Sequence, residues 1–230
     1  MDCWICGMPA TTGEHKTKRS DLRSLFGVPS QKEPLYFHTD ERRNKRVGSL
    51  DAPILKSPAR ICNLCNSGRT QPHDRAWQQF SEIVRENEHL LTQKGSVRAN
   101  RIFPYDTRRA MLYVHLYWVK IFGCAAAEGG IPVTLSPLAD SILLGRANPN
   151  VYLSFGWMHF SVTMAGASNI EVALLDGVCA YATRFHNIGN LAVNLIYAIP
   201  GERRQGLIGA WHPRLGAKRL RLKPFDIESA

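Results

Sequence analysis

The sequence has 230 residues, with 29 Lys+Arg against 19 Asp+Glu and a formal net charge of +10. Its composition, 44% hydrophobic and 21% charged, is that of an ordinary globular protein and excludes disordered, collagen-like and coiled-coil chains. A chain of this length buries a core without disulfide bonds. The six cysteines are therefore not needed as staples.

The N-terminus and the apolar stretches bear on where the protein resides. Met1 is followed by Asp2 and Cys3, with no basic segment leading into an apolar one, so we expect no signal peptide and a cytoplasmic location. The longest stretch without a charged side chain, residues 147–170, contains Pro149 and several Asn and Ser residues. A membrane-spanning helix would not tolerate them, and we expect no membrane partner.

The first unit expected is residues 1–95. Residues 1–70 are rich in Cys, Lys, Arg, Pro and Gly, and they carry 12 basic against 7 acidic residues, which is half of the net charge. Such a segment is typical of a small module organised by a metal. In residues 73–93, Trp77, Phe80, Val84 and Leu91 recur at helical spacing and predict an amphipathic helix. Residues 95–104 are expected to be a basic linker.

The second unit expected is residues 100–230. A helix is predicted from Thr107 to Ala127, closed by Gly129-Gly130 and apolar on most sides. After it the apolar residues alternate, in 151–157, 160–164, 172–174 and 191–197, with a hairpin turn at Asp176-Gly177. We therefore predict an α+β fold in which residues 150–223 form an antiparallel meander on that helix. Its role is open between substrate, partner and ligand recognition.

Four cysteines form two Cys-x-x-Cys pairs, Cys3 with Cys6 and Cys62 with Cys65. A gap of two residues lets both thiolates of a pair reach one ion about 2.3 Å away, so the pattern predicts a structural zinc. The alternatives are four unrelated buried thiols or a redox pair, and a redox pair would not explain the second one. Cys124 and Cys179 lie in apolar surroundings and are expected in the core.

Further polar residues stand at fixed places around these pairs. Glu14-His15 lies eight residues after Cys6, and Asn66 directly follows Cys65. The order Cys-x-x-Cys, Glu-His, Cys-x-x-Cys-Asn entering a helix resembles the HNH, or ββα-metal (His-Me finger), nuclease family in its zinc-stapled form. The resemblance covers residues 3–80, and the run CNLCNSGRTQPHDRAW also resembles uncharacterised bacterial HNH modules.

The resemblance implies that His15 is the general base and that Glu14 and Asn66 bind a catalytic Mg²⁺ or Mn²⁺, with zinc on the four cysteines. Phosphodiester hydrolysis needs a base that is neutral near pH 7 and a cation beside the phosphate, which suits these residue types. Alternatively, His15 is an inert histidine of the zinc module, and Glu14 and Asn66 have capping or supporting roles. His15 and Asn66 are 51 residues apart, which implies an insertion that contains PLYFHTDERRNKRVGS.

Two residues near Asn66 are further candidates. His73 is a candidate third metal ligand or phosphate contact, against helix capping by His73-Asp74 where Pro72 starts a new helix. Arg69 is a candidate contact to phosphate or to the transition state.

Basic residues gather around these positions. Phosphate backbones are bound by such side chains with little regard to sequence, and the alternative is a solvated basic surface. The predicted nucleic-acid contacts are Lys16, Lys18, Arg19, Arg42, Arg43, Lys45 and Arg46. A second basic cluster, in residues 214–223, is expected on an edge strand, where it extends that surface or protects the edge.

Together these features predict a metal-dependent HNH-type endonuclease that hydrolyses phosphodiester bonds of DNA, with RNA left open. A homo-oligomer, a regulatory protein partner and a place in a defence system are compatible with the second unit. The alternative is a non-catalytic zinc-knuckle protein that binds nucleic acid or acts as an adaptor.

Overall fold

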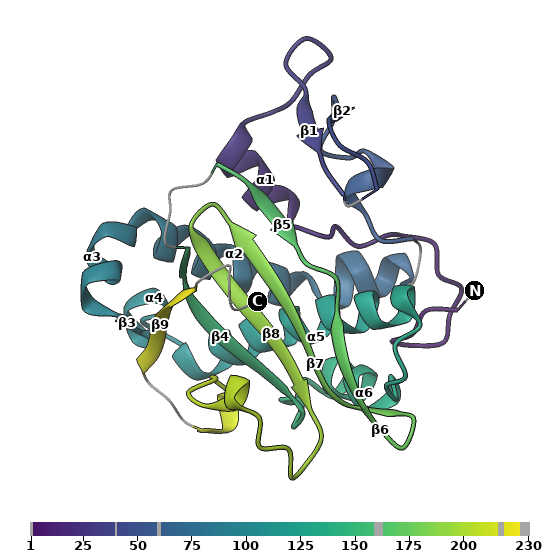
Figure 1. The fold of residues 1–230 in the computed structure, drawn as a ribbon, viewed down its shortest axis with the longest axis vertical. Helices are drawn as coiled ribbons and strands as arrows, with labels where there is room; N and C mark the ends of the chain where they lie inside the picture. The colour runs from purple at the N-terminus through teal and green to yellow at the C-terminus, as the bar shows by residue number, and fades with distance from the viewer. Residues whose placement is uncertain (1, 40, 59–60, 159–162, 216–218, 226–230) are drawn as a thin grey trace.

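The computed structural model describes residues 2–39, 41–58, 61–158, 163–215 and 219–225. These residues form an α+β structure with a seven-stranded sheet in the order β3-β9-β4-β8-β7-β5, in which β6 also pairs with β7, and a separate two-stranded sheet of β1 and β2 (Figure 1). The strands are β1 Leu35–Phe37, β2 Lys45–Val47, β3 Ser96–Arg98, β4 Val151–Met158, β5 Ala165–Ala167, β6 Glu171–Leu175, β7 Val178–Ile188, β8 Leu191–Ala198 and β9 Arg219–Phe225.

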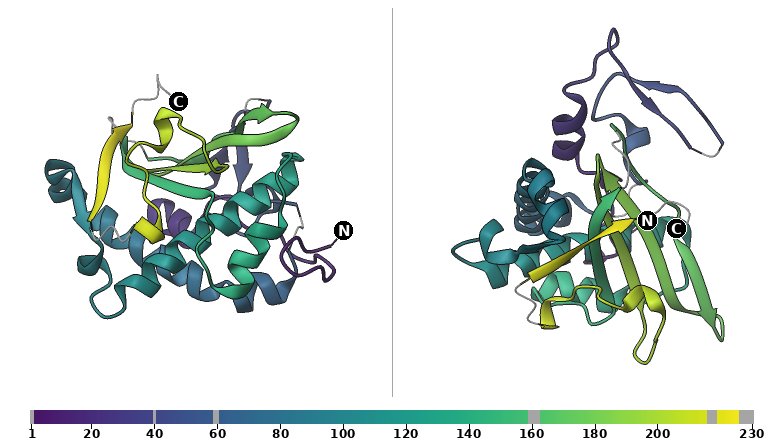
Figure 2. Two further views of the ribbon diagram at one scale, coloured as in Figure 1. Left: turned by 90° about the horizontal axis from the view of Figure 1, so that it is seen from below. Right: turned by 60° about the vertical axis from the view of Figure 1, so that its left-hand side comes forward.

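The helices lie mainly on one face of the large sheet. Figure 2 shows α2, α5 and α6 beneath the strands, with α5 crossing the middle of the layer. The helices are α1 Arg19–Phe26, a π-helical turn η2 Leu64–Arg69, α2 Gln71–Glu86, α3 Glu88–Lys94, α4 Ala99–Ile102, α5 Thr107–Gly129 and α6 Ser136–Leu144. Short 3-10 turns are η1 Pro53–Leu55, η3 Gln205–Leu207 and η4 Pro213–Leu215.

Helix α5 confirms the second predicted helix. It begins at Thr107 and ends before Gly130, whose φ of 61° is the left-handed conformation that glycine adopts at low cost. By length and composition α5 is apolar enough to cross a membrane, but 78% of its most apolar window is buried inside the structure. Within the described fold α5 is the central core helix.

The helix predicted over residues 73–93 is two helices. Trp77, Phe80 and Val84 are buried as expected, and Pro72 stands in the first turn of α2. Helix α2 ends before Asn87, whose side-chain amide N–H caps it by donating to the carbonyl oxygen of Ile83 at 2.9 Å. Helix α3 then begins at Glu88 and turns away (Figure 1).

The predicted linker over residues 95–104 is wrong. Strand β3 pairs with β9 there, and helix α4 follows it directly. Val97, Ile102 and Phe103 are buried, and one continuous core extends from Cys3 to Leu222 across this segment. Three apolar residues among basic neighbours are enough to anchor it. The division into two domains stays a prediction.

The sheet confirms the alternating strands in part. Strands β4, β8 and β7 are antiparallel neighbours, and Asp176-Gly177 makes the turn between β6 and β7 with positive φ at both residues. The meander is confirmed only where β6, β7 and β8 pair in chain order. It is wrong at both ends, because β4 pairs with β8 rather than with β5, and β9 pairs parallel with β4 and lies between β3 and β4. Strand β9 is therefore not an edge strand. The predicted strand at 160–164 lies largely outside the described residues.

Residues 17–54, which we call the arm, project from the rest of the molecule (Figure 1). They contain α1 and the β1–β2 hairpin, which lies in the segment predicted as an insertion. Leu22, Val47 and Leu50 form a small separate core with Leu55. The arm thus has a small core of its own, and α1 also packs on α2, where the buried carboxylate of Asp21 accepts hydrogen bonds from Trp77 at 2.9 Å and Ser81 at 2.7 Å. The root of the arm is the segment that carries His15.

Candidate functional site

The four predicted zinc ligands converge. The sulfur atoms of Cys3, Cys6, Cys62 and Cys65 all lie within 4.8 Å of one another, and all four are free of disulfide bonds. Sulfurs arranged tetrahedrally about 2.3 Å from a zinc ion stand about 3.8 Å apart, and those of Cys6 and Cys62 are 3.5 Å apart. The cluster therefore has the size and donor set of a metal site. No other group of three or more His, Cys, Asp and Glu ligand atoms converges within the described residues.

Backbone geometry shapes the first Cys-x-x-Cys turn. Gly7 donates its N–H to the carbonyl oxygen of Cys3 at 2.8 Å, with a φ of 74° that favours glycine. A hydrogen bond from the backbone of Met8 is the main cause that lowers the pKa of Cys6 to about 7. Burial raises the pKa of Cys3 in the same turn, so it is Cys6 that the turn favours as a thiolate, the form that binds metal.

The second turn brings a cation to the cluster. The guanidinium of Arg69 lies 3.0 Å from the sulfur of Cys65, and the backbone N–H of Cys65 points at the sulfur of Cys62 at 3.4 Å. A site of four thiolates around one divalent ion carries net negative charge, which Arg69 offsets. The sequence predicts Arg69 as a phosphate contact, whereas the structure places it on the cysteine cluster.

The cysteine cluster is packed onto α5 through Trp4. Its indole lies directly against Gly123, where any side chain would overlap the ring, and its N–H points to the sulfur of Cys124 at 3.5 Å. Cys124 is buried, as is Cys179, which confirms both as core residues. The module and the central helix are thus one packed unit.

Two extended segments precede the helix that carries Asn66. Residues 11–16 run antiparallel to residues 55–58 and 61, with paired positions at Thr12 with Ile61 and at His15 with Lys56. Cys62 and η2 follow directly. The side-chain amide N–H of Asn66 donates to the hydroxyl of Thr12 at 3.1 Å. The local order is therefore strand-like, strand-like, helix, with the cysteine cluster at the junction.

Glu14 faces the core. Its carboxylate lies 3.0 Å from the ammonium of Lys120 in α5, and Asp74 in the first turn of α2 lies 2.8 Å from the same nitrogen. Lys120 has no exposed side-chain surface. Burial by itself lowers the pKa of Lys120, but the two carboxylates outweigh it and hold that pKa above its ordinary value. We call Glu14, Asp74 and Lys120 the ion-pair cluster.

His15 faces away from that cluster, toward the arm. Its Nε2 lies 3.0 Å from the carbonyl oxygen of Leu50. Because a carbonyl oxygen can only accept, Nε2 carries the hydrogen and Nδ1 keeps its lone pair in the neutral ring. Burial is the main cause that lowers the pKa of His15, while Asp51 acts in the opposite direction. At neutral pH the ring is an uncharged base.

His73 lies on the other side, close to the ion-pair cluster. It is 4% exposed, its ring centroid is 5.2 Å from that of Tyr113, and its buried Nδ1 has no hydrogen-bond partner within the described residues. Burial first, and then the charge of Lys120, lower the pKa of His73 to about 4. The predicted site residues therefore lie in two places. Glu14 and His73 are buried in the interior of the fold, whereas His15 lies on the side that faces the arm.

The sequence reasoning missed Lys120. It is the only charged residue between Arg109 and Glu128 in an otherwise apolar helix. A lone charge in such a helix must be paired when it is buried. That signal is sufficient to predict carboxylate partners for Lys120, although not which ones.

The predicted nucleic-acid contacts lie mainly on the arm and its root. Lys16 pairs with Glu128 at 3.4 Å and Arg19 with Asp51 at 2.9 Å, while Arg46 donates to the carbonyl oxygen of Gln31 at 2.9 Å. Four exposed side chains of this set have no ion pair to any described residue, namely Arg42, Arg43, Lys45 and Arg46, and of these Arg46 is held by its hydrogen bond. Lys18, also unpaired there, is partly buried.

Comparison with known protein families, with curated proteins and with solved structures finds no match to this chain. The geometry by itself shows four cysteines placed to bind a metal ion at the start of a helix. A histidine with a fixed tautomer lies on the neighbouring segment.

Proposed function

We propose that this protein is a zinc-stapled, metal-dependent phosphodiester hydrolase of the HNH type that acts on nucleic acid, with His15 as its general base. The observation that carries the proposal is the hydrogen bond from His15 Nε2 to the Leu50 carbonyl oxygen. It turns a basic nitrogen outward from the root of a basic arm.

The base step follows from this hydrogen bond. Nδ1 of His15 accepts a proton from a water molecule, which then attacks the phosphorus in line with the leaving oxygen. The positive charge that forms on the ring is stabilised mainly by the Leu50 carbonyl oxygen. Of the nearby charges, Lys56 and Arg19 lower the pKa of His15 and Asp51 raises it. The hydrogen bond to Leu50 also holds the ring in place before the step.

Zinc on the four cysteines has a structural role in this proposal. It joins residues 3–6 to the start of η2 and so fixes segment 11–16 beside the helix that carries Asn66. The four-sulfur donor set leaves no open position for a substrate. The hydrolytic chemistry therefore belongs to His15 and its neighbours.

We further propose that Asn66 helps to orient a substrate phosphate or its cation. Its amide N–H is held by Thr12, which leaves the amide oxygen without a hydrogen bond to any described residue. A bound Mg²⁺ or Mn²⁺ would neutralise charge on the phosphate. Glu14 can join such a site only by leaving Lys120, so we assign it to holding segment 11–16 against α5.

Nucleic acid is the substrate class that the arm favours. Arg42, Arg43 and Lys45 are exposed and unpaired within the described residues, so they are available to phosphates. Contacts of this kind bind DNA or RNA with little sequence preference.

The test is cleavage of supercoiled plasmid and of labelled single-stranded DNA and RNA, each in Mg²⁺ and in Mn²⁺. Loss of a general base lowers the rate by about 10²- to 10⁴-fold, so we expect His15→Ala to lose nearly all activity. His89→Ala, at an exposed histidine in α3, is the matched control and should retain it. Equal cutting by His15→Ala would exclude the base assignment, and intact substrates in every metal would exclude hydrolysis.

One observation favours the alternative of a non-catalytic nucleic-acid-binding protein. Glu14, which stands in the family's metal-ligand position, is neutralised by Lys120. If the wild type binds labelled DNA but leaves it intact, and His15→Ala binds equally well, this second function replaces the first.

A further inference from the structure

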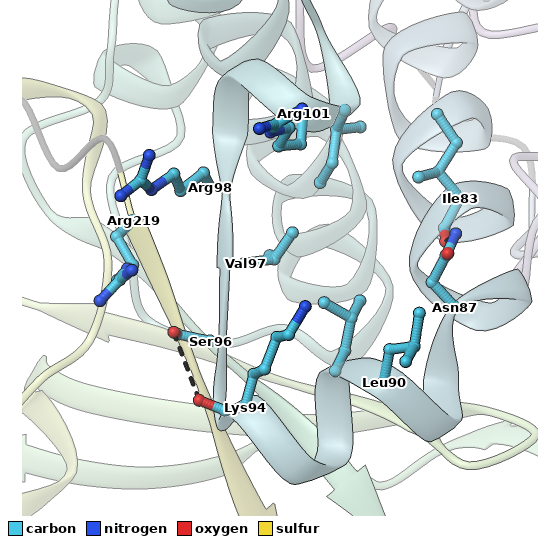
Figure 3. Close-up of a pocket in the computed structure, with 11 residues that line it drawn as sticks. Ile83, Asn87, Leu90, Lys94, Ser96, Val97, Arg98, Arg101 and Arg219 are labelled. Atoms are coloured by element: carbon cyan, nitrogen blue, oxygen red, sulfur yellow. Dashed lines mark hydrogen bonds between the residues drawn. The ribbon is translucent and has the colours of Figure 1, made fainter.

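A cavity at the α3–β3 end of the molecule, away from the arm, combines positive charge with an apolar wall (Figure 1, Figure 3). It has a volume of about 510 Å³, within the range of small-molecule sites. Helix α2 before Asn87 and the α3–β3–α4 segment after it form the cavity, together with Arg219 at the start of β9. The proposed hydrolysis assigns nothing to this cavity.

Four cations line it and no carboxylate does. They are Lys94, Arg98, Arg101 and Arg219. None of the four makes an ion pair with a described residue, so their charges are not neutralised locally. Four unpaired cations around one cavity repel one another, and an anion that enters relieves this repulsion. Arginine also offers paired N–H groups that match phosphate oxygens.

Apart from Asn87 and Ser96, the rest of the lining is aliphatic. Ile83, Leu90 and Leu91 belong to α2 and α3, while Val97 and Ile102 belong to β3 and α4. The Leu90 side chain is 42% exposed because it faces the cavity and not the packed core. This surface is the kind that an apolar or planar part of a ligand covers. An inorganic anion alone would leave these aliphatic side chains exposed to water.

The two kinds of group lie on different sides. Figure 3 shows Arg98 and Arg219 together on the β3–β9 side, with Arg101 above and Lys94 reaching up from below. Ile83, Asn87 and Leu90 lie across from them on the helices. The amide N–H of Asn87 is held by Ile83, and its amide oxygen has no hydrogen bond to a described residue. That oxygen is a fixed acceptor above the aliphatic wall.

We infer that this cavity binds a nucleoside polyphosphate, with its phosphates on Arg98, Arg101, Arg219 and Lys94 and its base on the aliphatic wall beside Asn87. Several phosphates match four separate cations better than one does. An amino group on the base supplies the donor that the Asn87 oxygen lacks. A diacyl lipid has a larger apolar part than the cavity holds. The inference does not depend on the hydrolysis proposed above.

The test is titration of the full-length protein with ATP, GTP, CTP, UTP, AMP and inorganic pyrophosphate, at physiological salt, by isothermal calorimetry. We expect a triphosphate with an amino group on its base to bind most tightly, and AMP and pyrophosphate at least 10-fold more weakly. Arg98→Ala with Arg101→Ala should weaken the triphosphate at least 10-fold. Leu90→Ala should weaken the triphosphate and leave pyrophosphate unchanged. Arg146→Ala, at an exposed arginine just after α6, is the matched charge control and should change neither.

Several results would overturn the inference. These are no binding of any nucleotide, equal binding of pyrophosphate and triphosphates with no effect of Leu90→Ala, or equal losses in Arg146→Ala. If no mononucleotide binds, but a single-stranded oligonucleotide binds and is lost in the variant with Arg98→Ala and Arg101→Ala, the cavity is assigned to a nucleic-acid strand instead. The substituted side chains are exposed, so unchanged thermal unfolding should accompany each variant and exclude misfolding.

Discussion

The two sides of segment 11–16 have opposite environments. Inward, Glu14 is buried against Lys120 and Asp74, between α2 and α5. Outward, His15 is half-buried and meets the backbone of Leu50, with Asp51 nearby. Because successive side chains of an extended segment point to opposite faces, adjacent residues serve different purposes. The inner side holds the segment in the fold, and the outer side presents the base.

This division changes how the Glu-His pair is interpreted. In the family that the sequence resembles, both residues belong to one catalytic site. Here the carboxylate that would bind a cation already has one, the ammonium of Lys120. The inner side should therefore govern stability, and the outer side should govern activity and binding.

The largest expected effect is on the cysteine cluster, which fixes both sides at once. Cys62→Ser should abolish binding of about one zinc per chain and release the N-terminal segment, because structural zinc sites contribute on the order of 10 kcal/mol to folding. Metal analysis of purified protein and thermal unfolding measure this. Cys179→Ser, at a buried cysteine of β7 outside the cluster, should keep its zinc. If Cys62→Ser retained its full zinc content, the four cysteines would not be the ligands of a structural zinc.

The next largest effect is on the ion-pair cluster. Lys120→Met leaves two carboxylates in the core without a cation, and we expect a loss of about 3–5 kcal/mol in the free energy of unfolding. Urea unfolding measures it. Arg109→Met, which breaks an exposed pair with Asp106 in the same helix, should cost no more than about 1 kcal/mol.

A double variant makes this test specific. Adding Glu14→Gln to Lys120→Met removes one of the two stranded charges, so part of the lost stability should return. If the double variant is less stable than Lys120→Met by the full cost of Glu14→Gln alone, Glu14 and Lys120 are not coupled. The contact between Glu14 and Lys120 would then not be what holds segment 11–16 in the fold.

The sequence predicted those parts of the molecule that local patterns determine. Helix α5 follows from its apolar run and the glycines after it, and the cysteine cluster follows from two short spacings. The orientation of Glu14 does not, because it depends on the pairing of residues 11–16 with 55–58 across the whole arm and on a lysine more than 100 residues away. The parallel pairing of β9 with β4 has the same cause, since long-range pairing leaves no local pattern.

A smaller effect is the pH dependence of stability that arises from two buried histidines in α5 and β7. His115 and His186 are buried, and burial is the main cause that holds the pKa of each well below its usual value. The unfolded chain takes up protons near pH 6.5 and the folded chain does not. Stability is therefore full above about pH 6.5 and falls as the pH is lowered, by about 1.4 kcal/mol per pH unit for each such histidine.

Unfolding in urea at pH 7, 6 and 5 measures this slope. In His186→Phe, which keeps the ring contact with Trp118, the slope between pH 6 and 5 should decrease by about 1.4 kcal/mol per pH unit. His89→Ala, at an exposed histidine, should leave the slope unchanged. An unchanged slope in His186→Phe would mean that this ring is protonated in the folded protein.

The smallest effect on stability is expected on the outer side, in the arm. Replacing Arg42, Arg43 and Lys45 together by alanine should change the free energy of unfolding by less than about 0.5 kcal/mol, because these exposed side chains pair with no described residue. The same variant should bind DNA more weakly, and the slope of log affinity against log salt should decrease by about 1 for each phosphate that these side chains neutralise in the wild type. Filter binding from 50 to 200 mM salt measures it. An unchanged slope would place the nucleic acid elsewhere, and a large loss of stability would show that these three side chains contribute to the fold as well as to binding.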